Sequence, residues 1–156
     1  MNERQAVPVF AEDLPVGTTY RTGAYEFTVE AIRGFAEQWD PLWFHLDAAQ
    51  AERGPFGGLI ASGLHSLAVL QRLLAAEVYS TWRIYVGRRF GSVEFLRPVR
   101  PGTRAWARLE VTRTEPRDSQ RWLVTTRTEL VADEGRLLSV EVEQYVWSRR
   151  ADELTA

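Results

Sequence analysis

The sequence predicts an α+β domain in which a curled antiparallel sheet of about five strands wraps around one long buried helix. Two observations lead to this fold class. The segment Leu59–Val78 is apolar nearly all round its helical circumference, which is typical of a buried helix. The second half of the chain alternates apolar and polar residues in several runs, which indicates antiparallel strands. A sheet of this length is the element available to cover the helix.

Length and composition fit one domain over residues 1–156, with its core at about 18–147. The chain has 156 residues, of which 45% are hydrophobic and 26% are charged. A chain of this size buries roughly 70% of its unfolded surface, so it folds without a disulfide or a metal. We find no internal repeat and no low-complexity segment.

Composition excludes several chemistries and locations. The absence of cysteine excludes thiolate catalysis and thiolate zinc sites, and the absence of lysine excludes Schiff-base chemistry. A net charge of −2 argues against nucleic-acid binding. No apolar segment reaches the roughly 18 residues of a membrane span, and the first ten residues lack a secretory apolar core. We therefore expect a cytoplasmic protein without a membrane or nucleic-acid partner.

The first half of the chain predicts one strand and three helices. Tyr20–Phe27 is the expected first strand, and Thr28 is the expected N-cap of a helix over Val29–Gln38. That helix ends at Asp40, because the proline that follows disfavours helical backbone. We expect a short helix at Ala48–Glu52, capped by Asp47. The glycine-rich segment 54–58 then breaks the chain before the helix Leu59–Val78.

The remaining strands follow as a meander. A long β-prone run covers Trp82–Leu96, and alternating runs follow at Ala105–Val111, Trp122–Leu130 and Leu138–Val142. Turns are expected at Pro101–Gly102, Pro116–Ser119 and Asp133–Gly135, so consecutive strands would pair antiparallel.

The two histidines, His45 and His65, flank the glycine-rich segment. Asp40 precedes His45 by five residues, and a connection of this length can bring both side chains to one point. A carboxylate and an imidazole that converge on one water can share acid and base work. The alternative is structural, since an aspartate before proline is a common turn residue. We interpret His65 as a packing or interface residue.

The pattern Asp40-Pro41-x-x-Phe44-His45-x-Asp47, followed by Phe56-Gly57-Gly58-x-Ile60-x-Ser62-Gly63, resembles the MaoC-like acyl dehydratases, which include R-specific enoyl-CoA hydratases. The resemblance implies a hotdog fold and reversible water addition to an enoyl thioester. It implies Asp40 and His45 as catalytic residues and the Gly63 amide as an oxyanion hole. It also implies substrate contacts by Ser62, Phe56 and Gly58. It implies no metal and no cofactor apart from the coenzyme A or acyl carrier that belongs to the substrate. Two departures stand out: proline directly follows Asp40, and Ser62 replaces a common histidine.

Two alternatives from other classes remain, a hotdog acyl-CoA thioesterase and a non-catalytic acyl-binding subunit. Such thioesterases usually use an acidic residue in the helix region, and Leu59–Ala76 contains none. Four arginines between residues 87 and 100 are candidates to meet coenzyme A phosphates, namely Arg88, Arg89, Arg97 and Arg100.

We also expect a two-fold homodimer. A curled sheet of five strands leaves two open edges, and six tryptophans exceed what one small core needs. The resembling family joins two sheets side by side, which implies that the helix Leu59–Val78 lies close to the partner. It also implies that residues of the second chain help to line each Asp40/His45 pocket.

Overall fold

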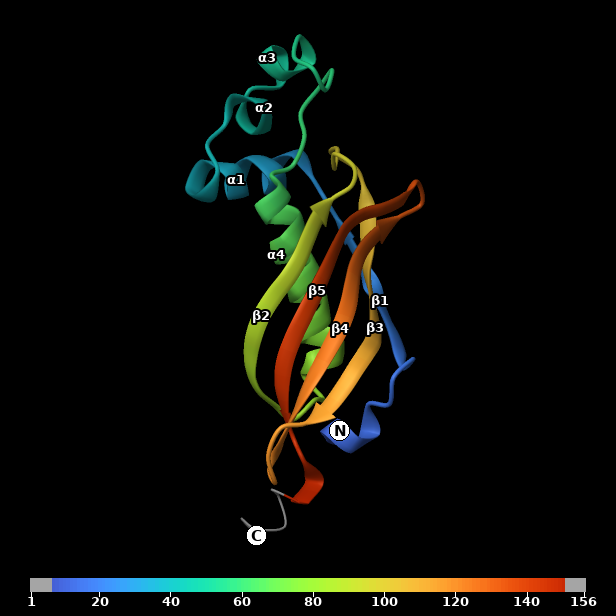
Figure 1. Ribbon diagram of the computed structural model, residues 1–156. Coiled ribbons are helices and arrows are strands. Elements are labelled where there is room, and N and C mark those ends of the chain that lie inside the picture. The colour runs from blue at the N-terminus through green and yellow to red at the C-terminus, as the bar shows by residue number, and fades with distance from the viewer. Residues whose placement is uncertain (1–6, 151–156) are drawn as a thin grey trace, which may run out of the picture.

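A five-stranded antiparallel sheet and one long helix form the centre of the molecule. The computed structural model describes residues 7–150. Its strands are β1 (Thr19–Glu26), β2 (Ile84–Phe95), β3 (Arg104–Pro116), β4 (Arg121–Ala132) and β5 (Gly135–Trp147), in the spatial order β1-β3-β4-β5-β2. The predicted meander is confirmed for β3, β4 and β5. The expected pairing of β2 with β3 is wrong, because β2 crosses over to pair with β5, so β1 and β2 form the two edges (Figure 1).

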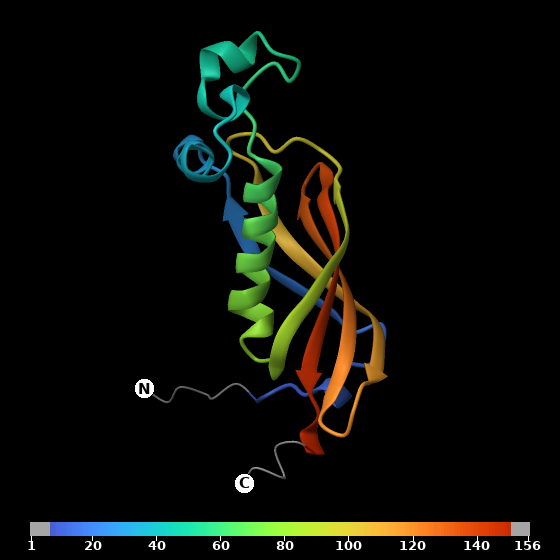
Figure 2. The same cartoon turned by 60° about the vertical axis from the view of Figure 1, so that its left-hand side comes forward.

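The alternation of the strands is explained by the helix that they face. On β3 the residues Ala105, Ala107, Leu109 and Val111 are buried, and the intervening positions are more exposed. Leu138, Val140 and Val142 of β5 belong to the same core cluster as Leu70 and Leu74 of the helix. The curved sheet lies along one side of the helix (Figure 2).

The central helix starts later than the sequence predicts. Helix α4 covers Gly63–Leu74 and continues as one π-helical turn, η2 (Ala75–Tyr79). The predicted start at Leu59 is wrong, because residues 59–62 are not helical and Ser62 is the N-cap. Apolar residues alone carry no signal that separates a buried extended segment from the first turn of a buried helix.

One side of α4 is open in the single chain, contrary to the expectation of burial all round. The exposed stripe consists of Leu64, Ala68, Gln71 and Ala75, and Leu64 is 51% exposed. The opposite side, with Val69, Leu70 and Leu73, is buried. The enclosing sheet is therefore confirmed, but it covers one side of the helix only.

Three short helices lie beyond the N-terminal end of α4 (Figures 1 and 2). They are α1 (Val29–Trp39), α2 (Trp43–Leu46) and α3 (Ala48–Glu52); a short 3-10 turn, η1 (Ala11–Asp13), lies near the start of the chain. The predicted caps are confirmed, since Thr28 accepts the Ala31 amide and Asp47 accepts the Gln50 amide. Helix α2 was not predicted. Among residues 7–150, no helix is long and apolar enough to cross a membrane.

Candidate active site

The structure brings the side chains of Asp40 and His45 together. Asp40 is the residue at which α1 ends, and His45 lies in α2, so the turn at Pro41 folds the second helix back against the first. The Asp40 Oδ2 atom lies 3.5 Å from the His45 Nε2 atom. One water can therefore contact both groups.

The ring of His45 is held by the backbone of a distant segment. Its Nδ1 atom lies 2.7 Å from the carbonyl oxygen of Ile60. A carbonyl only accepts hydrogen bonds, so Nδ1 carries the proton of the neutral imidazole. Nε2 then presents its lone pair towards Asp40. The ring is 4% exposed and packs edge-on against Phe44.

Asp40 is bonded in turn by Ser62. The Ser62 hydroxyl donates to Asp40 Oδ2 at 2.6 Å and accepts the Leu64 amide at 3.1 Å. The second contact is the N-cap bond of α4. Ser62 is completely buried, whereas the side chain of Asp40 is 25% exposed.

The amide of Gly63 opens α4 next to this group. As the first residue of the helix it has no intrahelical carbonyl to bond, and the helix N-terminus favours negative charge in front of it. The ring of Phe95 packs directly against Gly63. A β-carbon at position 63 would lie 2.7 Å from the Phe95 Cε1 atom, so only glycine fits without movement of the ring.

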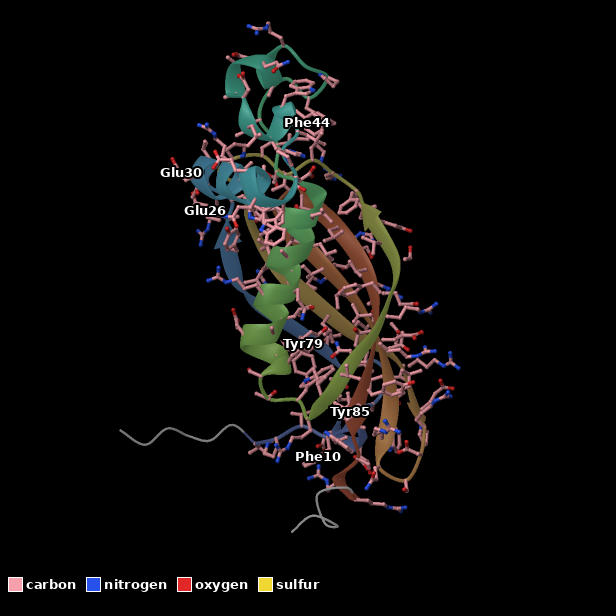
Figure 3. The ribbon with its side chains drawn as sticks, turned by 90° about the vertical axis from the view of Figure 1, so that its left-hand side faces the viewer. Phe10, Glu26, Glu30, Phe44, Tyr79 and Tyr85 are labelled. Carbon is pink, nitrogen blue, oxygen red and sulfur yellow. The ribbon has the colours of Figure 1, made fainter. Side chains whose placement is uncertain are left out.

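These residues line one cleft of about 500 Å³. Its polar groups are Asp40, His45, Ser62, Gly63, Ser66 and Arg97, and its walls are mainly apolar. Phe44 lies above the N-terminal end of α4, and Tyr79 lies near the other end of the helix (Figure 3). The cleft combines apolar walls with a few convergent polar groups, as small-molecule sites do.

The three expected substrate contacts occupy different environments. Phe56 lines the cleft and is 40% exposed. Gly58 lies outside the lining, in a turn where its amide bonds the Ala51 carbonyl and its φ of 153° favours glycine. The Ser62 hydroxyl already has two protein partners. Sequence reasoning missed Phe95, since nothing in a strand end predicts contact with a glycine 32 positions earlier.

The four candidate arginines separate into two pairs. Arg88 and Arg89 both bond the carboxylate of Glu143 on β5, the second at 2.8 Å. Burial raises the pKa of Glu143, but the bonds from the two arginines outweigh it and leave that pKa below its usual value. Arg97 lines the cleft, and Arg100 donates to the Phe56 carbonyl at its rim.

His65 is confirmed as a packing residue of the core. Its ring stacks on Phe35 at 4.7 Å and contacts Tyr25 and Phe27 edge-on. Burial lowers the pKa of His65, and its Nδ1 atom has no hydrogen-bond partner among residues 7–150. It does not line the cleft with His45.

A larger hollow of about 830 Å³ lies on the outer face of the sheet, over β1, β3 and β4. Its carboxylates are already paired, Glu110 with Arg127 at 3.3 Å and Glu129 with Arg136 at 3.1 Å. Arg21 stacks over the ring of Trp106. It contains no histidine, so the cleft at α4 is the better candidate for acid–base chemistry.

Comparison with known proteins shows the family of the chain. A family model for the MaoC-like domain matches residues 11–133. The protein YdeM of Bacillus subtilis, of uncharacterized function, is 27% identical over 114 residues, which are 73% of this chain and 81% of YdeM. The 3-hydroxyacyl-thioester dehydratase Z of Mycobacterium tuberculosis is 36% identical over 83 residues, 51% of this chain and 54% of the relative.

Structural similarity extends over most of the chain. The R-hydratase PhaJ1 of Pseudomonas aeruginosa superposes with a TM-score of 0.70 at 26% identity, over 88% of this chain and 84% of PhaJ1. The shared architecture is the hotdog fold that the motif implied. The sheet order, the long helix packed against the sheet and a family match over residues 11–133 lead to one conclusion: this chain belongs to the MaoC-like dehydratase domain family.

Proposed function

We propose that this protein is a hydro-lyase that adds water reversibly across the α,β double bond of an enoyl thioester. The observation that carries the proposal is the pairing of Asp40 with His45, 3.5 Å apart, in an apolar cleft that also contains the N-terminus of α4. Proteins named as a 3-hydroxyacyl-thioester dehydratase and an R-hydratase are among its relatives, and they support the same reaction class.

The pair supplies both proton transfers of the reaction. In the hydration direction the water oxygen bonds to the β-carbon and the π electrons move towards the thioester carbonyl. The pair takes one proton from the water and returns one proton to the α-carbon, so its own proton count is unchanged. The neutral tautomer of His45, fixed by Ile60, leaves Nε2 free to accept the proton of the water.

The Gly63 amide is the proposed oxyanion hole. Negative charge develops on the thioester oxygen as the β-carbon is attacked, and an amide at a helix N-terminus stabilises charge at that place. The packing of Phe95 on Gly63 supports close approach, because any larger residue would occupy the space beside the amide.

A thioesterase is the second candidate, and the cleft favours it less. Hotdog thioesterases usually use an acidic residue in the helix region, and α4 with η2 carries one acidic residue, Glu77. Glu77 lies in η2, bonds the Gly23 amide at 2.8 Å and is not part of the cleft. A non-catalytic acyl-binding subunit would need no convergent acid–base pair.

The carrier end of the substrate is assigned to Arg97 and Arg100. Arg97 lines the cleft, and Arg100 bonds the carbonyl oxygen of Phe56, a residue that also lines it. Among residues 7–150, neither arginine forms an ion pair with a carboxylate. Arg88 and Arg89 share the carboxylate of Glu143, and Arg89 also lies 3.5 Å from the carboxylate of Glu141, so we assign the two arginines no phosphate contact. Arginine forms strong hydrogen bonds with phosphate, which supports a coenzyme A thioester.

We further propose a homodimer formed through β2 and the open side of α4. The edge strand β2 exposes Tyr85, Val86, Phe90 and Val93, of which Phe90 is 52% exposed. An exposed apolar edge strand pairs readily with another chain. The stripe on α4 that starts at Leu64 adjoins the cleft, so a partner covering it would also reach the site.

The direct test follows the loss of enoyl-thioester absorbance with crotonyl-CoA and longer substrates. The variant Asp40→Asn should fold normally and lose roughly 10²-fold or more in turnover, the usual scale for a lost general acid or base. Asp47→Asn is the matched control, because asparagine caps a helix as well as aspartate. Release of free thiol without loss of the double bond would instead identify a thioesterase. Equal turnover of both variants would remove Asp40 from the mechanism.

A further inference from the structure

The hydroxyl of Ser62 forms two hydrogen bonds inside the protein, one as donor and one as acceptor. It has one hydrogen to donate, and its oxygen accepts the Leu64 amide at 3.1 Å. The hydrogen therefore points at Asp40 Oδ2, 2.6 Å away. Ser62 belongs to the lining of the cleft but is completely buried in the single chain, and its one hydrogen is already used by Asp40. Its arrangement is that of an internal support rather than a ligand contact.

Asp40 depends on this single bond. Among residues 7–150, no other group donates a hydrogen bond to its carboxylate. His45 Nε2 lies 3.5 Å from Asp40 Oδ2, a longer distance than the 2.6 Å between the Ser62 hydroxyl and the same carboxylate oxygen. The side chain is 25% exposed at the end of α1, so without the Ser62 hydroxyl water competes for the carboxylate. The carboxylate is then free to turn away from His45.

We propose that Ser62 is a positioning residue that holds the Asp40 carboxylate against His45 Nε2, and not a residue that binds substrate. The inference rests on the proposed hydro-lyase function of the pair. The Ser62 hydroxyl then has two roles, because the oxygen that caps α4 through the Leu64 amide also belongs to the group that orients the Asp40 carboxylate. Loss of the Ser62 hydroxyl lowers the rate of the chemical step, because the walls of the cleft that contact the substrate and the Gly63 amide remain in place.

The test compares Ser62→Ala with Thr28→Ala. Both remove a hydroxyl that caps a helix, and each should lower Tm by about 2–4 °C, the shift that the loss of one cap produces in a chain of this length. Only Ser62→Ala removes a bond to Asp40. We expect its kcat for crotonyl-CoA to fall by about 10²-fold, as for a catalytic group misplaced by roughly 1 Å, with KM within threefold of the wild type. Ser62→Thr retains the hydroxyl and should recover most of the rate.

Three results would overturn the inference. An increase of KM with unchanged kcat would make Ser62 a substrate ligand. Equal rate losses in Ser62→Ala and Thr28→Ala would reduce its role to helix stability. A crystal structure of Ser62→Ala in which Asp40 Oδ2 remains about 3.5 Å from His45 Nε2 would contradict the positioning role whatever the activity. Absence of hydration by the wild type, with a displaced Asp40 in that crystal structure, would instead reject the proposed function and leave the positioning role standing.

Discussion

Substitution of Gly63 by alanine tests whether the helix N-terminus must stay uncrowded. The new β-carbon would lie 2.7 Å from Phe95 Cε1 and 2.9 Å from Cζ, whereas ordinary contact begins at 3.4 Å. The ring therefore has to retreat by about 0.7 Å, the difference between 2.7 Å and 3.4 Å. Phe95 is 57% exposed, so the ring can move at modest cost in stability. The main effect falls on the cleft wall beside the amide.

The magnitude follows from two opposing effects. Overpacking costs about 1–3 kcal/mol, and the exposed ring places this case at the lower end. Replacement of a helical glycine by alanine stabilises the folded state by about 0.5–1 kcal/mol. The two effects oppose each other, so the free energy of unfolding should change by less than roughly 1 kcal/mol. Displacement of a site wall by most of an ångström should lower kcat/KM by roughly 10- to 100-fold. Activity is thus the sensitive measurement.

The assay is the hydration of crotonyl-CoA, with thermal unfolding measured in parallel. Gly34→Ala is the matched control, because a β-carbon added to this glycine of α1 would meet nothing within 4 Å, and the variant should gain stability without losing activity. Adding Phe95→Ala to Gly63→Ala removes the clash and should restore part of the rate. Activity of Gly63→Ala within twofold of the wild type would refute the reasoning, as would a double variant no better than the single one.

Three further predictions concern other parts of the molecule. Burial lowers the pKa of His65 below its ordinary 6.5, so the unfolded chain binds the proton more readily than the folded protein. Stability is therefore lost as pH falls through 6.5. Tm should drop between about pH 7 and 5, and it should drop less steeply in His65→Phe. An equal slope in both proteins would exclude His65 as the cause. Arg97→Gln should raise KM for a coenzyme A thioester about tenfold at unchanged kcat, which is the lower end of the effect expected for a lost hydrogen bond between charged groups. The same variant should leave KM for a phosphate-free pantetheine thioester unaltered. Light scattering should give twice 17.8 kDa for the wild type and a monomer for Phe90→Glu; a wild-type monomer with full activity would reject the shared pocket.

The parts of the fold that depend on local patterns were predictable from the sequence. Alternation located β3, β4 and β5, and the caps at Thr28 and Asp47 marked two helix starts. The proximity of Asp40 and His45 followed from a short connection with a proline. Each of these features is decided within about ten residues of chain, where propensity and sterics act.

The remaining features depend on contacts between distant segments. The true start of α4 is set by hydrogen bonds of residues 60 and 61 to Phe44 and Val99, which no apolar pattern encodes. Phe95 reaches Gly63 only because β2 ends beside α4. The ion pairs of Arg88 and Arg89 with Glu143 join residues more than fifty positions apart. Side-chain partners of this kind are tertiary and leave no mark on local composition.

The extended segment that leads into α4 limits which changes of sequence the site can tolerate. Within four consecutive residues, the Ile60 carbonyl fixes the tautomer of His45, the Ser62 hydroxyl bonds Asp40, and Gly63 presents its amide. Backbone hydrogen bonds from Ile60 to Phe44 and from Ala61 to Val99 hold this segment at both sides. Moving the helix start by one residue would rotate each following position by about 100°, so the groups at the helix start would lose their alignment with the Ile60 carbonyl and His45. Insertions should therefore be tolerated in the glycine-rich turn at 54–58 but not between residues 60 and 63, and redesign of the chemistry has to preserve this backbone register before it alters any side chain.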